Sequence, residues 1–145
     1  MTTVRKILES KTGAVWSVAP DMPLVDALRL MADKKVGALL VRENDRIVGI
    51  FTERDFARHI IQVESPSAQT PVRQLMIERV YVISPEEPLE QCIALMVEKQ
   101  FRHLPVMENN QVIGMVSIRD VVKQAIEEKD NVIQNLEDYI WQKPG

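Results

Sequence analysis

Two short stretches of the sequence each bring together a hydroxyl, a guanidinium and a carboxylate. They are Thr52, Arg54 and Asp55 in the first stretch, and Ser117, Arg119 and Asp120 in the second. Each stretch follows an apolar run with one glycine and precedes a helical pattern, so its residues stand at the start of an expected helix. Helix starts favour phosphate, a guanidinium matches phosphate geometry, and a carboxylate can accept hydrogen bonds from ribose hydroxyls. Both stretches are therefore candidate nucleotide-binding segments.

The same two stretches also fit a structural role. A hydroxyl residue at the N-cap and a carboxylate three residues later form the pattern of a capping box, in which each side chain bonds the other residue's backbone N–H. Arg54 and Arg119 have no part in a capping box, although a surface arginine can pair with a nearby carboxylate. The two interpretations are compatible, and the sequence leaves both open.

The two stretches belong to an internal repeat, which predicts two copies of one structural unit. A constant shift of 65 positions, without an insertion, aligns Pro20 with Pro85, Pro23 with Pro88, Gly49 with Gly114 and Asp55 with Asp120. Residues 4–8 similarly resemble residues 72–76, so each repeat begins with its own lead-in segment. Residues 64–71 are rich in turn-forming residues. We therefore expect a first repeat with its lead-in over residues 1–63, a linker over 64–71, and a second repeat over 72–145.

Within each repeat the pattern predicts strand, helix, strand, strand, helix. The first repeat shows strand patterns at 15–18, 39–41 and 47–51, a helix that begins near Pro23, and a turn at Asn44 and Asp45. The second shows strands at 80–83, 104–107 and 112–116 and a helix over 89–99. A short lead helix at the N-terminus and a long C-terminal helix over 120–143 complete an α+β fold. Each repeat has a small core of its own, so we expect the two to pack about a pseudo-twofold axis with a cleft at their seam.

The expected C-terminal helix carries an apolar stripe. Its members are Val122, Ile126, Val132, Ile133, Leu136 and Ile140, with charged residues between them. A helix exposed on all sides would not need such a stripe. We expect it to pack on its own module or on a second copy of the chain, with Tyr139 and Trp141 as anchors, and we favour a homodimer.

The paired motifs resemble the nucleotide motif of CBS domains. The resemblance rests on residues 49–55 and 114–120, on the lead-in, and on residues 101–106, and it extends over residues 4–122. It implies a Bateman module, in which two repeats form two clefts that bind AMP, ATP, ADP, NAD or, in some members, S-adenosylmethionine. Such a module has a regulatory role, which here would be the sensing of energy or redox state.

The resemblance also implies a role for each matched residue. Asp55 and Asp120 would bind ribose hydroxyls, and Thr52 and Ser117 would bind ribose or phosphate. Adenine would lie between apolar strand residues, and phosphate would meet basic ones. The adenine positions map to Val18, Ile83, Val36, Gly37, Ala38 and the stretch that includes Pro105, and the basic positions to Arg102 and His103. The first repeat has Gly37 and Ala38 where the second has Arg102 and His103, so we expect one site to be the stronger.

Composition excludes several other classes of function. A net charge of -3 and a pI near 5.5 argue against nucleic-acid binding. No apolar run approaches the length of a membrane span, and residues 1–11 lack the core of a signal peptide, which favours a cytoplasmic location. Cys92 is the only cysteine and is expected to be a small buried core residue. With two histidines, His59 and His103, we expect no metal site and no catalytic cofactor.

Three functions remain for the chain. The first is a non-catalytic regulatory module that binds an adenine nucleotide and alters a protein partner. The second is a structural dimerisation or adaptor module without a ligand. The third, an enzyme, has the least support, because no hydroxyl, histidine and carboxylate recur in a spacing that suggests a triad.

Overall fold

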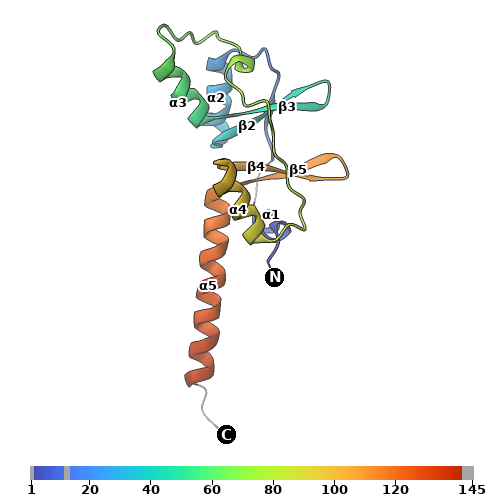
Figure 1. The fold of residues 1–145 in the computed structure, drawn as a ribbon, viewed down its shortest axis with the longest axis vertical. Coiled ribbons are helices and arrows are strands. Elements are labelled where there is room, and N and C mark those ends of the chain that lie inside the picture. The colour runs from blue at the N-terminus through green and yellow to red at the C-terminus, as the bar shows by residue number, and fades with distance from the viewer. Residues whose placement is uncertain (1, 12–13, 142–145) are drawn as a thin grey trace. The chain divides into compact units, whose positions relative to one another are not determined.

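The computed structural model describes residues 2–11 and 14–141, without the side chains of Val132, Tyr139, Ile140 and Trp141 (Figure 1). The anchors expected at Tyr139 and Trp141 therefore lie outside the described side chains. The chain divides into two compact units, one of residues 14–81 and one that combines residues 1–13 with residues 82–145. Helices and short strands occur in both units, which confirms the expected α+β class.

The unit of residues 14–81 contains a three-stranded sheet. Its elements are β1 (Ser17–Val18), α2 (Leu24–Lys34), β2 (Ala38–Glu43), β3 (Arg46–Thr52), α3 (Glu53–Gln62) and the 3-10 helix η1 (Val72–Gln74). The strand order is β1-β2-β3, with β1 parallel to β2 and β2 antiparallel to β3. The predicted turn joins β2 to β3, and its residues Asn44 and Asp45 have φ of 51° and 63°, as a two-residue hairpin of the primed type requires.

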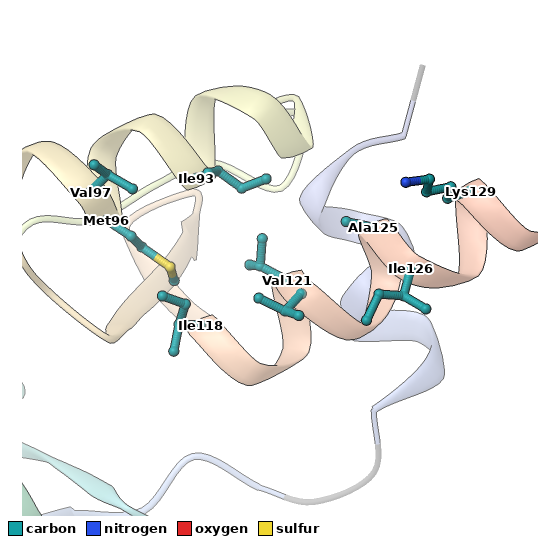
Figure 2. Close-up of a pocket in the computed structure, with 9 residues that line it drawn as sticks. Ile93, Met96, Val97, Ile118, Val121, Ala125, Ile126 and Lys129 are labelled. Atoms are coloured by element: carbon teal, nitrogen blue, oxygen red, sulfur yellow. The ribbon is translucent and has the colours of Figure 1, made fainter.

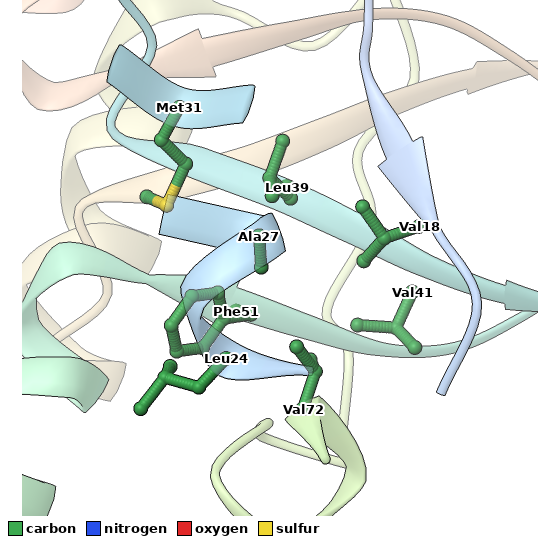
Figure 3. Packing of buried hydrophobic residues seen from close by; sticks show 8 residues of the cluster. All are labelled: Val18, Leu24, Ala27, Met31, Leu39, Val41, Phe51 and Val72. Atoms are coloured by element: carbon green, nitrogen blue, oxygen red, sulfur yellow. The ribbon is translucent and has the colours of Figure 1, made fainter. Parts of the chain in front are cut away.

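The core of this unit lies between α2 and the sheet (Figure 3). Ala27 and Met31 extend from one face of α2, and Leu39, Val41 and Phe51 come from β2 and β3. Leu39, Val41 and Phe51 are fully buried, as expected for alternating positions on the covered face of a sheet. This packing fixes the end of β3, where the candidate site begins.

The second unit is built from residues at both ends of the chain. Its elements are α1 (Val4–Ser10), α4 (Leu89–Lys99), β4 (His103–Glu108), β5 (Gln111–Ser117) and α5 (Ile118–Trp141). The predicted helix over 89–99 matches α4, and α5 confirms the long C-terminal helix within the described residues. The strand predicted over 80–83 is wrong, because only Ile83 pairs there, in a parallel bridge with Val106. Its amide donates to Pro105, and its carbonyl accepts from Met107.

The two lead-in segments are exchanged between the repeats. The amide of Val4, in the first lead-in, donates to Glu87 of the second repeat, and that of Val72, in the second lead-in, donates to Met22 of the first. Ion pairs repeat the pattern: Arg5 pairs with Glu86 at 2.8 Å and Arg73 with Asp21 at 3.0 Å. Sequence alignment had indicated that each repeat begins with its own lead-in. The structure shows that each lead-in packs on the other repeat. The hydrogen-bond partners of each lead-in lie just before the first long helix of that other repeat.

Close packing of the lead-ins explains the repeated glycines. A Cβ atom on Gly114 would lie 2.6 Å from Leu8 Cδ2, and one on Gly49 would lie 2.6 Å from Met76 Sδ. Both distances are shorter than van der Waals contact allows. Each glycine therefore leaves room for the lead-in that packs against its strand.

Candidate functional site

The first candidate site lies where β3 ends and α3 begins. Thr52 is the N-cap of α3, and its hydroxyl accepts from the Asp55 amide at 3.3 Å. Asp55 Oδ2 in turn accepts from the Thr52 amide and from the Thr52 hydroxyl, each at 2.9 Å. The capping box considered from the sequence is thus confirmed at this junction. None of these three hydrogen bonds uses Asp55 Oδ1.

Two further predicted residues adjoin this junction. Ala38 pairs with Thr52 in the β2–β3 ladder, and the carbonyl of Gly37 accepts from the amide of Glu53 at 3.1 Å. The Asp55 side chain is buried, and this burial raises its pKa above the ordinary value, although the bonds from Thr52 act in the opposite direction. Gly37, Ala38, Thr52 and Asp55 therefore form one cluster around a carboxylate that is costly to ionise.

The second candidate site has the same construction at the junction of β5 and α5. The Ser117 amide donates to Asp120 Oδ2 at 2.8 Å, and the Asp120 amide donates to the Ser117 hydroxyl at 3.1 Å. His103 pairs with Ser117 in the β4–β5 ladder, as Ala38 pairs with Thr52. The Arg102 carbonyl accepts from the amide of Ile118 at 2.8 Å. Both capping boxes are therefore complete, and the second lies beside a histidine.

Lys11 distinguishes the second site from the first, and the sequence had not identified it. Its Nζ donates to Asp120 Oδ2 at 2.8 Å and to the Met115 carbonyl at 2.7 Å. Burial alone would raise the pKa of Asp120, but the hydrogen bonds from Lys11 and from the Ser117 amide lower it below its ordinary value. Lys11 reaches this site because the first lead-in packs on the second repeat. The alignment of each lead-in with its own repeat gave no signal for that contact.

The surroundings of His103 at the second site favour its neutral form. Burial is the main cause of its lowered pKa, and the positive charge of Lys11 adds to the effect. Its Nδ1 atom is buried without a hydrogen-bond partner among the described residues. A buried ring nitrogen without a partner normally needs one. His103 therefore offers an unused polar atom next to Ser117.

The remaining predicted residues differ in how accessible they are. Arg54, Arg102 and Arg119 are exposed. Val36 and Gly37 are half-buried. The apolar side chains assigned to adenine are mostly buried: Val18, Ala38, Ile83 and Pro105. Val18 belongs to the core cluster (Figure 3), so its side chain packs against other core residues.

Three further observations concern described residues outside the two junctions. Cys92 is fully buried, as predicted, and burial raises the pKa of its thiol to about 11. Among residues 2–11 and 14–141, no three or more His, Cys, Asp or Glu side chains are grouped so as to hold a metal ion. No helix within the same residues is sufficiently long and apolar to cross a membrane.

A comparison with known families shows which family the two repeats belong to. The family model for the CBS domain matches this chain twice, over residues 4–62 and 72–127. The chain belongs to the CBS domain family. The two matches confirm a tandem pair of CBS repeats, and residues 128–145 extend beyond the second match.

Relatives with CBS domains cover most of this chain. It is 34% identical to the mitochondrial CBS domain-containing protein CBSX3 of Arabidopsis thaliana, over 96% of this chain and 72% of that protein. A putative signal-transduction protein with CBS domains from Burkholderia ambifaria is 41% identical, with a TM-score of 0.83 over 87% of this chain and 95% of that one. The structure of CBSX2 in complex with AMP is 25% identical, with a TM-score of 0.70 over 86% of this chain and 97% of that one.

Proposed function

We propose that this CBS pair is a non-catalytic regulatory module that binds an adenine nucleotide, namely AMP, ATP, ADP or NAD. The observation that carries the proposal is the duplicated junction, in which a capping box holds a carboxylate at the start of a helix in each repeat. The AMP complex of CBSX2 supports an adenine ligand. Binding would report the energy or redox state of the cell.

The capping boxes and the proposed binding role do not compete for the same atoms. The capping bonds use the Oδ2 atoms of Asp55 and Asp120, so each Oδ1 can accept from a ribose hydroxyl. Because capping fixes the carboxylate, binding would cost little side-chain entropy. Exposed arginines at the same helix starts, Arg54 and Arg119, would meet the phosphates.

We propose that the second site binds more tightly than the first. It adds Lys11, Arg102 and His103 to the groups that the two sites share. The first site has Gly37 and Ala38 at the positions of Arg102 and His103, and it holds a carboxylate with a raised pKa. A cation near the ribose-binding carboxylate suits a phosphate ester, so we expect nucleotides to bind the second site better than adenosine does.

Calorimetric titration of the purified chain with AMP, ADP, ATP and NAD tests the proposal. Adenosine and GMP serve as controls for the phosphate and for the base. We expect at least one adenine nucleotide to bind and to raise the Tm, because at a ligand concentration of 100 Kd binding adds about 2.7 kcal/mol to the free energy of unfolding. If none of the four binds or shifts the Tm, the junctions are helix caps and the proposal is wrong. Mass spectrometry of the native protein would identify any nucleotide that co-purifies.

The second candidate function is an adaptor that dimerises without a ligand. It is favoured by α5, which exposes the large apolar residues Ile126, Ile133 and Leu136. The two functions are compatible, and we propose that the nucleotide-binding module is also a homodimer in the cytoplasm. Adaptor function alone predicts a dimer whose mass, stability and partner binding do not respond to any of the four nucleotides.

A further inference from the structure

The C-terminal half of α5 presents an apolar stripe that its own unit does not cover. Ile126, Ile133 and Leu136 are 55%, 45% and 56% exposed, and Val122 is 49% exposed. In the first half of the helix, Val121 and Gln124 face the unit and are buried. After Glu128, Asn131, Asn135 and Asp138 are all exposed. The described side chains in the C-terminal half of α5 are therefore not covered by the unit, and the stripe exposed there is apolar.

The spacing of this stripe is that of a coiled coil. Val122, Ile126, Lys129, Ile133 and Leu136 follow one another at intervals of four, three, four and three residues. In heptad terms, Ile126 and Ile133 take a positions, and Val122, Lys129 and Leu136 take d positions. A stripe with this period buries itself against a second helix of the same kind.

An apolar groove continues the stripe toward the N-terminal end of α5. It has a volume of about 250 Å³ and lies between α4 and α5 (Figure 2). Ile93 and Val97 from α4 form one wall, and Val122, Ile126 and Lys129 from α5 belong to both the groove and the stripe. Ile93 and Val97 are themselves exposed, at 38% and 68%. The groove and the stripe thus form one continuous surface that can accommodate a helix.

We propose that this surface pairs with α5 of a second copy of the chain in an antiparallel coiled coil. This inference deepens the homodimer proposed above and does not depend on nucleotide binding. A second copy fits in the antiparallel orientation because no two lysines then lie opposite each other in the apolar seam. A parallel pair would place Lys129 against Lys129 of the partner subunit in the apolar seam, where two like charges repel each other.

The antiparallel register pairs each a position with a d position of the other copy. Ile126 then meets Leu136 of the partner subunit, and Ile133 meets Lys129 of the partner subunit. At the flanking positions Lys123 faces Glu137 of the partner subunit twice in each dimer, and Asp130 faces Asp130 of the partner subunit once. Asp130 of the partner subunit lies about 4.5 Å along the axis from Lys129, within reach of its ammonium group. In this register the partner's α5 also ends over the groove between α4 and α5.

The first test is the solution mass of the full-length chain by sedimentation. We expect twice the chain mass of 16.6 kDa for the unmodified protein, and 16.6 kDa for the variant Ile133→Asp with Leu136→Asp at the same concentration. Asn135→Asp is the matched control, because it adds a negative charge to the same helix outside the stripe, and it should remain dimeric. An unchanged far-UV circular dichroism spectrum and a cooperative thermal transition would show that the double variant folds, although loss of the dimer should lower its Tm.

Charge exchange and crosslinking test the orientation without disrupting the seam. Lys123→Glu alone and Glu137→Lys alone should each weaken dimerisation by about tenfold, and the two together should restore it. A mixture of Ile126→Cys and Leu136→Cys chains should form a disulfide-linked dimer under mild oxidation, with the native Cys92 buried and unreactive.

Three results would overturn the inference. A monomeric unmodified chain contradicts both the coiled coil and the homodimer. An unchanged dimer mass in the Ile133→Asp and Leu136→Asp variant contradicts the coiled coil alone and leaves a dimer through another face. Disulfide formation by Ile126→Cys with itself, in place of the mixed pair, contradicts the antiparallel orientation. Nucleotide titration of each variant is independent of all three, so failure of the coiled coil is distinguishable from failure of the binding proposal.

Discussion

Replacing Asp120 by alanine separates its role in the helix cap from its proposed role in nucleotide binding. The substitution removes the acceptor for the Ser117 amide, and loss of that half of a capping box costs about 1 kcal/mol. It also removes the ion pair with Lys11, in which the Lys11 side chain is 39% exposed and the Asp120 side chain is 23% exposed. A pair with this exposure contributes about 0.2–1 kcal/mol. The expected loss of stability is therefore about 1–2 kcal/mol, which for a chain of this length lowers the Tm by about 2–8 °C.

The expected loss of nucleotide affinity is larger. A hydrogen bond to a charged acceptor contributes about 1.5–3 kcal/mol, which corresponds to a loss of about 10- to 150-fold in Kd. Asp120→Asn keeps an amide oxygen that can accept from the Ser117 amide, so its Tm should fall less than that of Asp120→Ala. It lacks the charge, however, and its affinity for AMP should still fall. Calorimetric titration and differential scanning calorimetry on the same samples give the two quantities separately.

Asp55→Ala is the matched control at the first junction. It breaks an equivalent capping box that has no ion pair to a lysine within the described part of the chain. It should lower the free energy of unfolding by about 1 kcal/mol and reduce AMP affinity less than Asp120→Ala does. The reasoning is refuted if Asp120→Ala and Asp120→Asn bind AMP within twofold of the unmodified chain while their Tm values fall as calculated. The aspartates would then serve as helix caps only.

Three further predictions concern the contacts around the two junctions. Lys11→Met should raise the pKa of the Asp120 carboxyl, because burial then acts without the opposing ammonium, and an NMR titration that shows no rise would contradict the ion pair. Burial lowers the pKa of His103 below 6.5 in the folded chain, so protons bind the unfolded chain more tightly and stability is lost as the pH falls below about 6.5. His103→Gln should flatten the fall in Tm between about pH 6.5 and pH 5, and an unchanged slope would exclude His103 as its source. Gly49→Ala and Gly114→Ala should each destabilise the chain by about 1–3 kcal/mol in denaturant unfolding. The loss should be greater at Gly49, because a Cβ there would also lie 3.0 Å from a backbone oxygen. The three atoms nearest a Cβ on Gly114 belong to one flexible leucine, which can move. A greater loss at Gly114 would contradict this packing argument.

Local signals in the sequence predicted most of the regular structure. Proline at positions 23 and 88 marks the N-caps of α2 and α4, and the helical spacing that follows predicts the extent of both helices. The hairpin turns are also local, since Asn and Asp tolerate positive φ. The strand predicted over 80–83 failed because apolar, β-prone residues do not by themselves provide a ladder partner, and only Ile83 found one.

The candidate sites were predicted only where the residues are close in the chain. Thr52 with Asp55, and Ser117 with Asp120, lie three residues apart, so the helix start brings them together. Lys11 lies 109 residues from Asp120, and their contact depends on hydrogen bonds of the first lead-in that no local pattern encodes. Core packing of Val18 was likewise not evident from its position on the first strand.

The exchange of lead-in segments makes the second repeat depend on the first residues of the chain, whereas residues 14–81 contain the first repeat together with the lead-in that packs on it. A fragment that starts at the linker would contain the second repeat's strands and helices but not α1, so Gly114 and the backbone of residues 85–89 would lose the partners that cover them. A polypeptide that held the second repeat without α1 could satisfy those groups only by borrowing a lead-in from another molecule. For the same reason, a damaging substitution in the first few residues should unfold the second repeat before the first.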